Sequence, residues 1–137
     1  MTLPFEFVVE GIPASVNMPG KTYQTWIQTV SRVAQQTWGN QAPLSDVAIR
    51  LEIIYFYFKY TQLDIDNIIK PIQDALNQLI YEDDWQVMDV LAQKRDIRGT
   101  YALRPTYLPL TAQIEKHQSF VYVKISVISD LEDLTVW

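Results

Sequence analysis

The chain has 137 residues, and 48% of them are hydrophobic. Its 11 Lys and Arg against 16 Asp and Glu give a formal net charge of −5. This charge excludes a uniformly basic DNA-binding surface. It has no cysteine and a single histidine, which excludes disulfides, cysteine nucleophiles and a histidine-rich zinc site. No apolar run reaches the roughly 18 residues of a transmembrane helix, and the first residues lack the basic region of a signal peptide, so we expect a cytoplasmic protein without membrane contact.

Hydrophobic periodicity predicts six elements in chain order: strand, helix, strand, helix, strand, strand. The strands are expected at residues 5–10, 47–60, 87–93 and 120–128, and the helices at residues 23–38 and 68–79. This order predicts an α/β (α+β) fold, a single mixed four-stranded sheet with two helices packed on it. We expect one domain over residues 1–137, with residues 99–111 as a mobile loop and residues 131–137 as a tail that is either flexible or packed on a partner subunit.

The second strand contains the aromatic run Tyr55-Phe56-Tyr57-Phe58. We expect both faces of this strand to be covered, one by helices and the other by a dimer partner, in preference to stacking on bases. Trp85 lies apart from this run and adjoins Asp84, so it is open to two interpretations. It stacks on a base of DNA, or it packs beneath the site described next.

Asp64 and Asp66 come directly after the second strand. In an extended chain, residues two apart point to the same side, so both carboxylates can face one site. We expect Asp66 or Asn67 to cap the helix that follows, because Pro71 is tolerated only near a helix start. The helix therefore begins close to the two aspartates.

Lys70 lies in the first turn of that helix, where its ammonium group can point back toward whatever the aspartates bind. Asp83 and Asp84 follow the helix in a polar break that can fold back beside the same loop. Mg²⁺ prefers hard oxygen ligands and usually takes only one or two carboxylates plus substrate phosphate, and a fixed cation can stabilise charge on a phosphate. Taken singly, these residues are more often helix caps and solvated turns. Together they indicate a metal-dependent nuclease.

These residues also resemble the RusA family of Holliday junction resolvases, or crossover junction endodeoxyribonucleases. The resemblance rests on Leu63-Asp64-Ile65-Asp66-Asn67-Ile68-Ile69-Lys70, which is similar to the family pattern D-x-D-N-x-x-K. It continues in Asp74-Ala75-Leu76 and in Asp83-Asp84-Trp85-Gln86-Val87, and a second match is the Gly11-Ile12-Pro13-Ala14-Ser15-Val16-Asn17 loop. It covers most of the chain to about Arg95, and the last third matches only in pattern.

The resemblance implies a homodimeric endonuclease that cuts four-way DNA junctions symmetrically with Mg²⁺, or with Mn²⁺ as a substitute. It implies that Asp64, Asp66 and Asp84 bind the metal, that these three and Lys70 are catalytic, and that Asp83 shares the metal binding. A two-fold dimer would place two cuts symmetrically about a junction.

DNA contacts are expected from a basic stretch that follows the third strand and from polar residues near the two loops. The basic stretch contains Lys94, Arg95, Arg98 and Arg104, with Tyr101 and Tyr107 interleaved, and the other candidates are Asn17, Lys21 and Asn67. A solvated basic loop without a DNA contact is an equally good interpretation of that stretch.

Two other function classes fit the same residues. One is a RusA-like module that binds junctions but cuts them weakly or not at all, which the negative charge allows. The other is a metal-dependent phosphodiesterase that acts on other nucleic acid substrates or small nucleotides. His117 lies in a polar stretch and is expected at the surface without a catalytic role.

Overall fold

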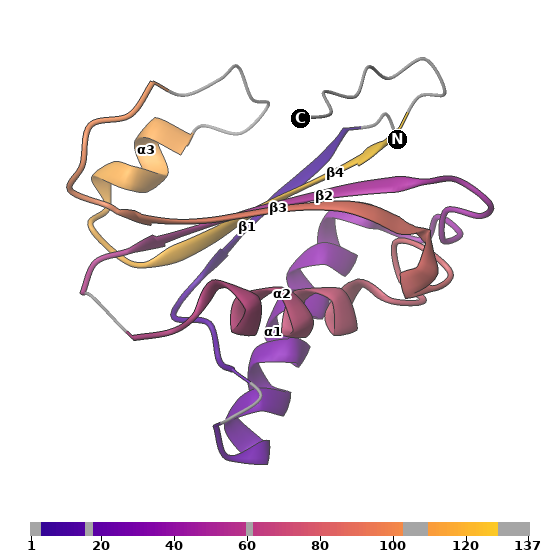
Figure 1. Cartoon of the computed structure of the whole chain (residues 1–137), viewed down its shortest axis with the longest axis horizontal. Coiled ribbons are helices and arrows are strands. Elements are labelled where there is room, and N and C mark those ends of the chain that lie inside the picture. The colour runs from indigo at the N-terminus through magenta and orange to yellow at the C-terminus, as the bar shows by residue number, and fades with distance from the viewer. Residues whose placement is uncertain (1–3, 16–17, 60–61, 103–109, 129–137) are drawn as a thin grey trace, which may run out of the picture.

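The computed structural model describes residues 4–15, 18–59, 62–102 and 110–128. Helices α1 and α2 cover one face of a four-stranded sheet, and α3 lies on the other face (Figure 1). The elements are β1 (Phe5–Glu10), α1 (Gly20–Trp38), β2 (Ile49–Tyr57), α2 (Ile65–Leu76), the 3₁₀ helix η1 (Asp84–Gln86), β3 (Val87–Asp96), α3 (Leu110–Glu115) and β4 (Phe120–Val127). The predicted class, a mixed four-stranded sheet with two helices packed on it, is confirmed, with the short α3 added.

The strand order is β1-β4-β2-β3, with β4 antiparallel to both of its neighbours and β3 parallel to β2. Consecutive parallel strands need a crossover connection of a dozen or more residues, and α2 supplies it here. The crossover returns the chain to the start of β3 through η1. Both ends of α2 therefore belong to the connection that carries the predicted site.

The second predicted helix lies three residues earlier than expected, at 65–76 and not 68–79. Asp64 is its N-cap residue, so the expectation of Asp66 or Asn67 at that position is wrong. The helix ends at Leu76 because Asn77 is extended, with φ −60 and ψ 131, and Gln78 then turns the chain at φ +66. Pro71 consequently lies inside the helix, where it removes one backbone hydrogen bond.

Two hydrophobic cores lie on the two faces of the sheet. The larger core joins α1 and α2 to the sheet through residues that include Val30, Ala34, Ile68, Ile72, Leu51 and Ile53. In the smaller core the ring of Phe56 stacks on Phe120 at 4.7 Å between ring centres, next to Leu110. The expectation that a dimer partner covers this face of the aromatic strand is wrong at Phe56, because α3 of the same chain covers it.

Helix α3 was not predicted, because six residues are too few to establish a helical period. Its first two residues, 110 and 111, are the last two of the predicted mobile loop 99–111. Residues 103–109 of that loop and the predicted tail 131–137 lie outside the described residues. His117 is exposed, as expected. None of the helices in the described residues is sufficiently long and apolar to cross a bilayer.

Candidate nuclease site

β2 ends at Tyr57, and Asp64 and Asp66 lie at the start of α2 with both side chains exposed. The expectation that the two lie in an extended chain directly after the strand is wrong, because Asp66 is already in the first turn of the helix. Asp64 holds the N-cap position, but its carboxylate accepts no capping hydrogen bond from the described backbone. Its carbonyl oxygen accepts a bond from the Asn67 N–H at 3.1 Å, and Asn67 itself is half-buried. The simple interpretation of these aspartates as helix caps therefore fails at Asp64, and both carboxylates face solvent.

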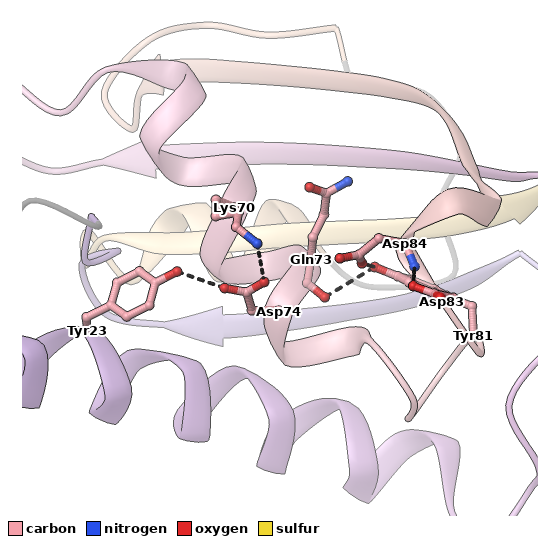
Figure 2. Close-up of polar contacts among 7 residues, drawn as sticks. All are labelled: Tyr23, Lys70, Gln73, Asp74, Tyr81, Asp83 and Asp84. Carbon is pink, nitrogen blue, oxygen red and sulfur yellow. Dashed lines mark hydrogen bonds and ion pairs between the residues drawn. The ribbon is translucent and has the colours of Figure 1, made fainter.

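Asp66, Lys70 and Asp74 follow one another at intervals of four residues, so they lie along one side of α2. Lys70 Nζ donates to Asp74 Oδ1 at 2.7 Å, and the Tyr23 hydroxyl of α1 donates to Asp74 Oδ2 at 2.9 Å (Figure 2). The hydrogen bond to Asp74 and its negative charge raise the pKa of Lys70, and the charge of Asp84 acts in the same direction. The Lys70 ammonium group is therefore held in an acidic environment.

The Asp84 side chain lies against the far end of α2 through Tyr81 (Figure 2). The Tyr81 hydroxyl lies 3.3 Å from the Gln73 carbonyl oxygen and 3.4 Å from Asp84 Oδ1, within hydrogen-bonding reach of both. Burial raises the pKa of Tyr81, and the charge of Asp84 adds to this, so the hydroxyl stays protonated at neutral pH. The polar break therefore folds back onto α2 at Gln73, near the end of the helix, whereas the sequence predicted that it would lie beside the Asp64 loop at the helix start.

Gln86 holds the turn that carries Asp83 and Asp84. Its side chain is fully buried, its Oε1 accepts from the N–H groups of Glu82 and Asp83, and its Nε2 donates to the carbonyls of Leu44 and Val47. Asp83 Oδ1 accepts the Asp84 N–H at 2.7 Å and completes a capping box with Gln86. One oxygen of Asp83 is thus engaged in capping, which leaves Asp84 as the half-buried carboxylate that faces α2.

The carboxylates do not form a compact metal cage. Within residues 4–15, 18–59, 62–102 and 110–128, no group of three or more Asp, Glu or His side chains could hold a metal ion. The donors are still hard carboxylate oxygens, and Mg²⁺ commonly takes one or two of them with water and substrate phosphate. The chemistry of the donor set therefore fits an open Mg²⁺ site that a DNA phosphate would complete, and it does not fit a closed three-carboxylate one.

The residues predicted to contact DNA differ in exposure and in their hydrogen-bond partners. Arg95 and Lys21 are exposed, whereas Lys94 is half-buried and its Nζ donates to the Leu63 carbonyl at 2.8 Å, directly before Asp64. The Arg98 guanidinium forms two bonds of 3.0 Å to the carboxylate of Asp96. Asn17 lies outside the described residues, as do Arg104 and Tyr107. Lys94 therefore supports the site loop, and Asp96 offsets the charge of Arg98.

Trp85 has 60% of its surface exposed, so packing beneath the site is wrong for this side chain. It follows Asp84 directly and precedes an edge strand that also exposes Met88 and Leu91. The other interpretation, in which the indole ring stacks on a base, is the one that this exposure allows.

Two residues near the site, Tyr23 and Tyr81, had not been predicted to take part in it, and the buried Gln86 had been noticed only within a motif. Asp74 had been noticed only as part of a motif, although its spacing of four from Lys70 is itself a signal of a helical ion pair. Tyr23 carries no such signal, because it lies 51 residues from its partner Asp74.

Residues 12–101 match the model of a protein family described as "Endodeoxyribonuclease RusA". This range contains every described residue of the site. A stretch of 34 residues is 53% identical to a Bacillus subtilis (strain 168) protein named "Uncharacterized protein YqaN". The stretch covers 25% of this chain and 24% of that protein, so the similarity spans about a quarter of the relative, whose name describes no activity.

Proposed function

The chain belongs to the RusA family of endodeoxyribonucleases, which resolve Holliday junctions, and from this premise we propose that it cuts four-way DNA junctions symmetrically in a Mg²⁺-dependent reaction. The observation that supports the proposal best is the return of the Asp84 turn to α2. Through Tyr81 this turn lies against the helix that carries Asp66 and Lys70, and the charge of Asp84 acts on Lys70. A lysine between carboxylates on one side of a helix is an arrangement suited to a phosphodiester and its cation.

We propose Asp64, Asp66 and Asp84 as the metal-binding carboxylates, with one or two of them binding Mg²⁺ beside the DNA phosphate, since the described residues form no preassembled group of three, and with Asp83 as the neighbour that caps the turn. A bound Mg²⁺, or Mn²⁺ in its place, would orient the phosphate and lower the pKa of the attacking water. Lys70 offers an ammonium group to a phosphate oxygen on which negative charge develops. Asp64 and Asp66 are exposed, so a DNA backbone can reach them without a change in the fold.

The exposed edge of β3 supports a homodimer. Met88 has 60% and Leu91 49% of its surface exposed, and Val90 beside them has 39%. An exposed edge strand with apolar side chains is a surface that another chain tends to cover. A second copy across a two-fold axis would cover it and would carry a second site, as two symmetric cuts require.

For DNA binding we propose contacts from Lys21, Asn67, Arg95 and Arg98, with Lys94 holding the loop before Asp64 and with Asn17 as a further contact. The net charge of −5 means that binding rests on few phosphate contacts, so we expect low affinity, with a shallow salt dependence because its slope scales with the number of phosphates contacted. A protein that acts on cellular DNA would work in the cytoplasm, and we include that location in the proposal.

The test is the cleavage of a labelled four-way junction beside a linear duplex of matched sequence, at low salt, with and without Mg²⁺. We expect paired symmetric nicks in the junction alone, lost without metal and lost in Asp66→Asn. Asp46→Asn is the matched control, since Asp46 is an exposed aspartate outside the site, and it should cut like the wild type. An uncut junction at every Mg²⁺ and Mn²⁺ concentration would refute the nuclease.

A junction-binding module without cleavage is the second candidate, and the lack of a three-carboxylate group among the described residues is the observation that favours it. A retarded but uncut junction in a gel-shift assay of the same samples would support this alternative. Cleavage of small nucleotide diesters with an intact junction would instead support a phosphodiesterase.

A further inference from the structure

Asp74 accepts hydrogen bonds from side chains on both α1 and α2, and it is not among the site residues assigned above. We infer that Tyr23 and Asp74 are positioning residues, which hold the ammonium group of Lys70 where it can meet the DNA phosphate. The inference rests on the proposed function, because it takes Lys70 to be the group that acts in cleavage.

The geometry assigns each oxygen of Asp74 one partner. Oδ1 accepts from Lys70 Nζ at 2.7 Å on the same helix, and Oδ2 accepts from the Tyr23 hydroxyl at 2.9 Å on α1 (Figure 2). A carboxylate that accepts from both sides cannot rotate without breaking one of the two bonds. Tyr23 therefore fixes the orientation in which Asp74 holds Lys70.

An ion pair between Lys70 and Asp74 alone would be an ordinary helical pair. Their side chains are 58% and 30% exposed, and exposed pairs at this spacing hold a flexible lysine only weakly. The hydroxyl of Tyr23 changes this, because tyrosine has few rotatable bonds and this residue is half-buried between α1 and α2. The second helix thus adds rigidity that the pair lacks.

Three elements surround the Lys70–Asp74 pair. The charges of Asp74, on the same helix, and of Asp84, on η1, act on Lys70, and the neutral hydroxyl of Tyr23 on α1 donates to Asp74. Burial and the bond to Asp74 raise the pKa of Tyr23 to about 12, so its hydroxyl remains a donor throughout the neutral range. An ammonium group has three N–H donors, and Asp74 takes one, which leaves donors for a phosphate oxygen.

The inference is tested by separating the rate of cleavage from the affinity for the junction. Single-turnover cleavage at saturating protein gives the rate, and a gel shift without metal gives the affinity. Because small displacements of a catalytic group are costly, we expect Tyr23→Phe to lower the rate about 5-fold and Asp74→Asn about 30-fold, with junction affinity unchanged. Tyr23→Phe keeps the packed ring, so it remains informative if Asp74→Asn fails to fold.

Tyr122→Phe is the matched control. The Tyr122 hydroxyl also donates to a carboxylate, that of Glu6, but on strands β4 and β1 and away from α2. Both tyrosine variants lose stability through the same kind of bond, so a drop in rate that appears only in Tyr23→Phe reports on Lys70 and not on folding.

Combining Tyr23→Phe with Lys70→Met separates the positioning role of Tyr23 from the role of Lys70 in cleavage. If Tyr23 acts through Lys70, then Tyr23→Phe should cause no further loss of rate in the Lys70→Met protein, because the two changes are not additive. A full additional loss would overturn the inference, as would a wild-type rate in Tyr23→Phe while Lys70→Met is impaired. A wild-type rate in Lys70→Met refutes the proposed role of Lys70 and the inference with it, whereas an uncut junction with wild type refutes the proposed function itself.

Discussion

The Asp84 turn depends on one buried side chain, and Gln86→Ala tests that dependence. The substitution removes four hydrogen bonds, two to the N–H groups of Glu82 and Asp83 and two to the carbonyls of Leu44 and Val47. A net hydrogen bond contributes about 1 kcal/mol, so their loss amounts to about 4 kcal/mol, and water that enters the space left by the side chain offsets part of this. We expect the free energy of unfolding to fall by about 3 kcal/mol.

Urea denaturation followed by circular dichroism measures the change directly, with the slope of the transition as a check on the unfolded state. A drop of this size is a large share of the roughly 5–15 kcal/mol that stabilises a typical domain. Gln35→Ala is the matched control, because Gln35 is exposed and its side chain makes one bond, to the Gly39 carbonyl. It should change stability by less than about 0.5 kcal/mol.

Gln86→Ala should also slow junction cleavage, because Asp84 loses the turn that directs it toward α2. A loss of stability under about 1 kcal/mol, with the slope unchanged, would refute the reasoning that these four bonds hold the turn. A variant that is destabilised as expected but cuts junctions at the wild-type rate would show that Asp84 does not need this turn for its role.

Four further outcomes are expected. Phe56→Ala should cost about 3–4 kcal/mol in urea denaturation, because Phe56 is 1% exposed and its ring loses the stack on Phe120. Leu91→Lys should shift the protein from dimer to monomer in sedimentation velocity, because it puts a charge on the β3 edge, and a monomeric wild type would contradict the proposed interface. Hydrogen bonds from Arg98 lower the pKa of Asp96 below its ordinary value of 3.8. The pair therefore stabilises the fold above about pH 4, and this stabilisation is lost as the pH falls through the lowered pKa. In Arg98→Gln, an NMR titration should find the Asp96 pKa raised. Chelation by EDTA should abolish cleavage and leave the melting temperature unchanged, since the described residues hold no closed metal site, and a lower melting temperature would indicate a structural metal.

Much of the architecture could be predicted, because it depends on local pattern. The first strand was expected at residues 5–10 and is observed as Phe5–Glu10, and the alternation of apolar residues located the other strands within a few residues. The start of α2 was wrong by three residues, because several polar residues in a row offered equally good caps. Helix α3 was missed for the opposite reason, since a single short stretch contains too little periodicity to stand out.

The residues of the candidate site could also be predicted from the sequence, but their arrangement in space could not. Motif and spacing identified Asp64, Asp66, Lys70 and Asp84, whose joint role in a nuclease site is still a prediction. The sequence also suggested that three carboxylates would gather, and the described residues do not form such a group. Carboxylates repel one another unless a cation lies between them, so their spacing along the chain cannot decide their final distance.

By itself, the sequence determined the four strands, the two long helices, the family and the acidic and basic residues at the start of α2, because periodicity and motif are properties of neighbouring residues. Only the tertiary structure decided that Tyr23 reaches Asp74 across 51 residues and that Gln86 reaches the carbonyl of Leu44 across 42. These contacts form only after the crossover has returned the chain to the sheet, and no local pattern encodes which distant partner a polar side chain will meet. The residues proposed to do the chemistry were thus readable in the sequence, whereas those that hold them in place became visible only in the fold.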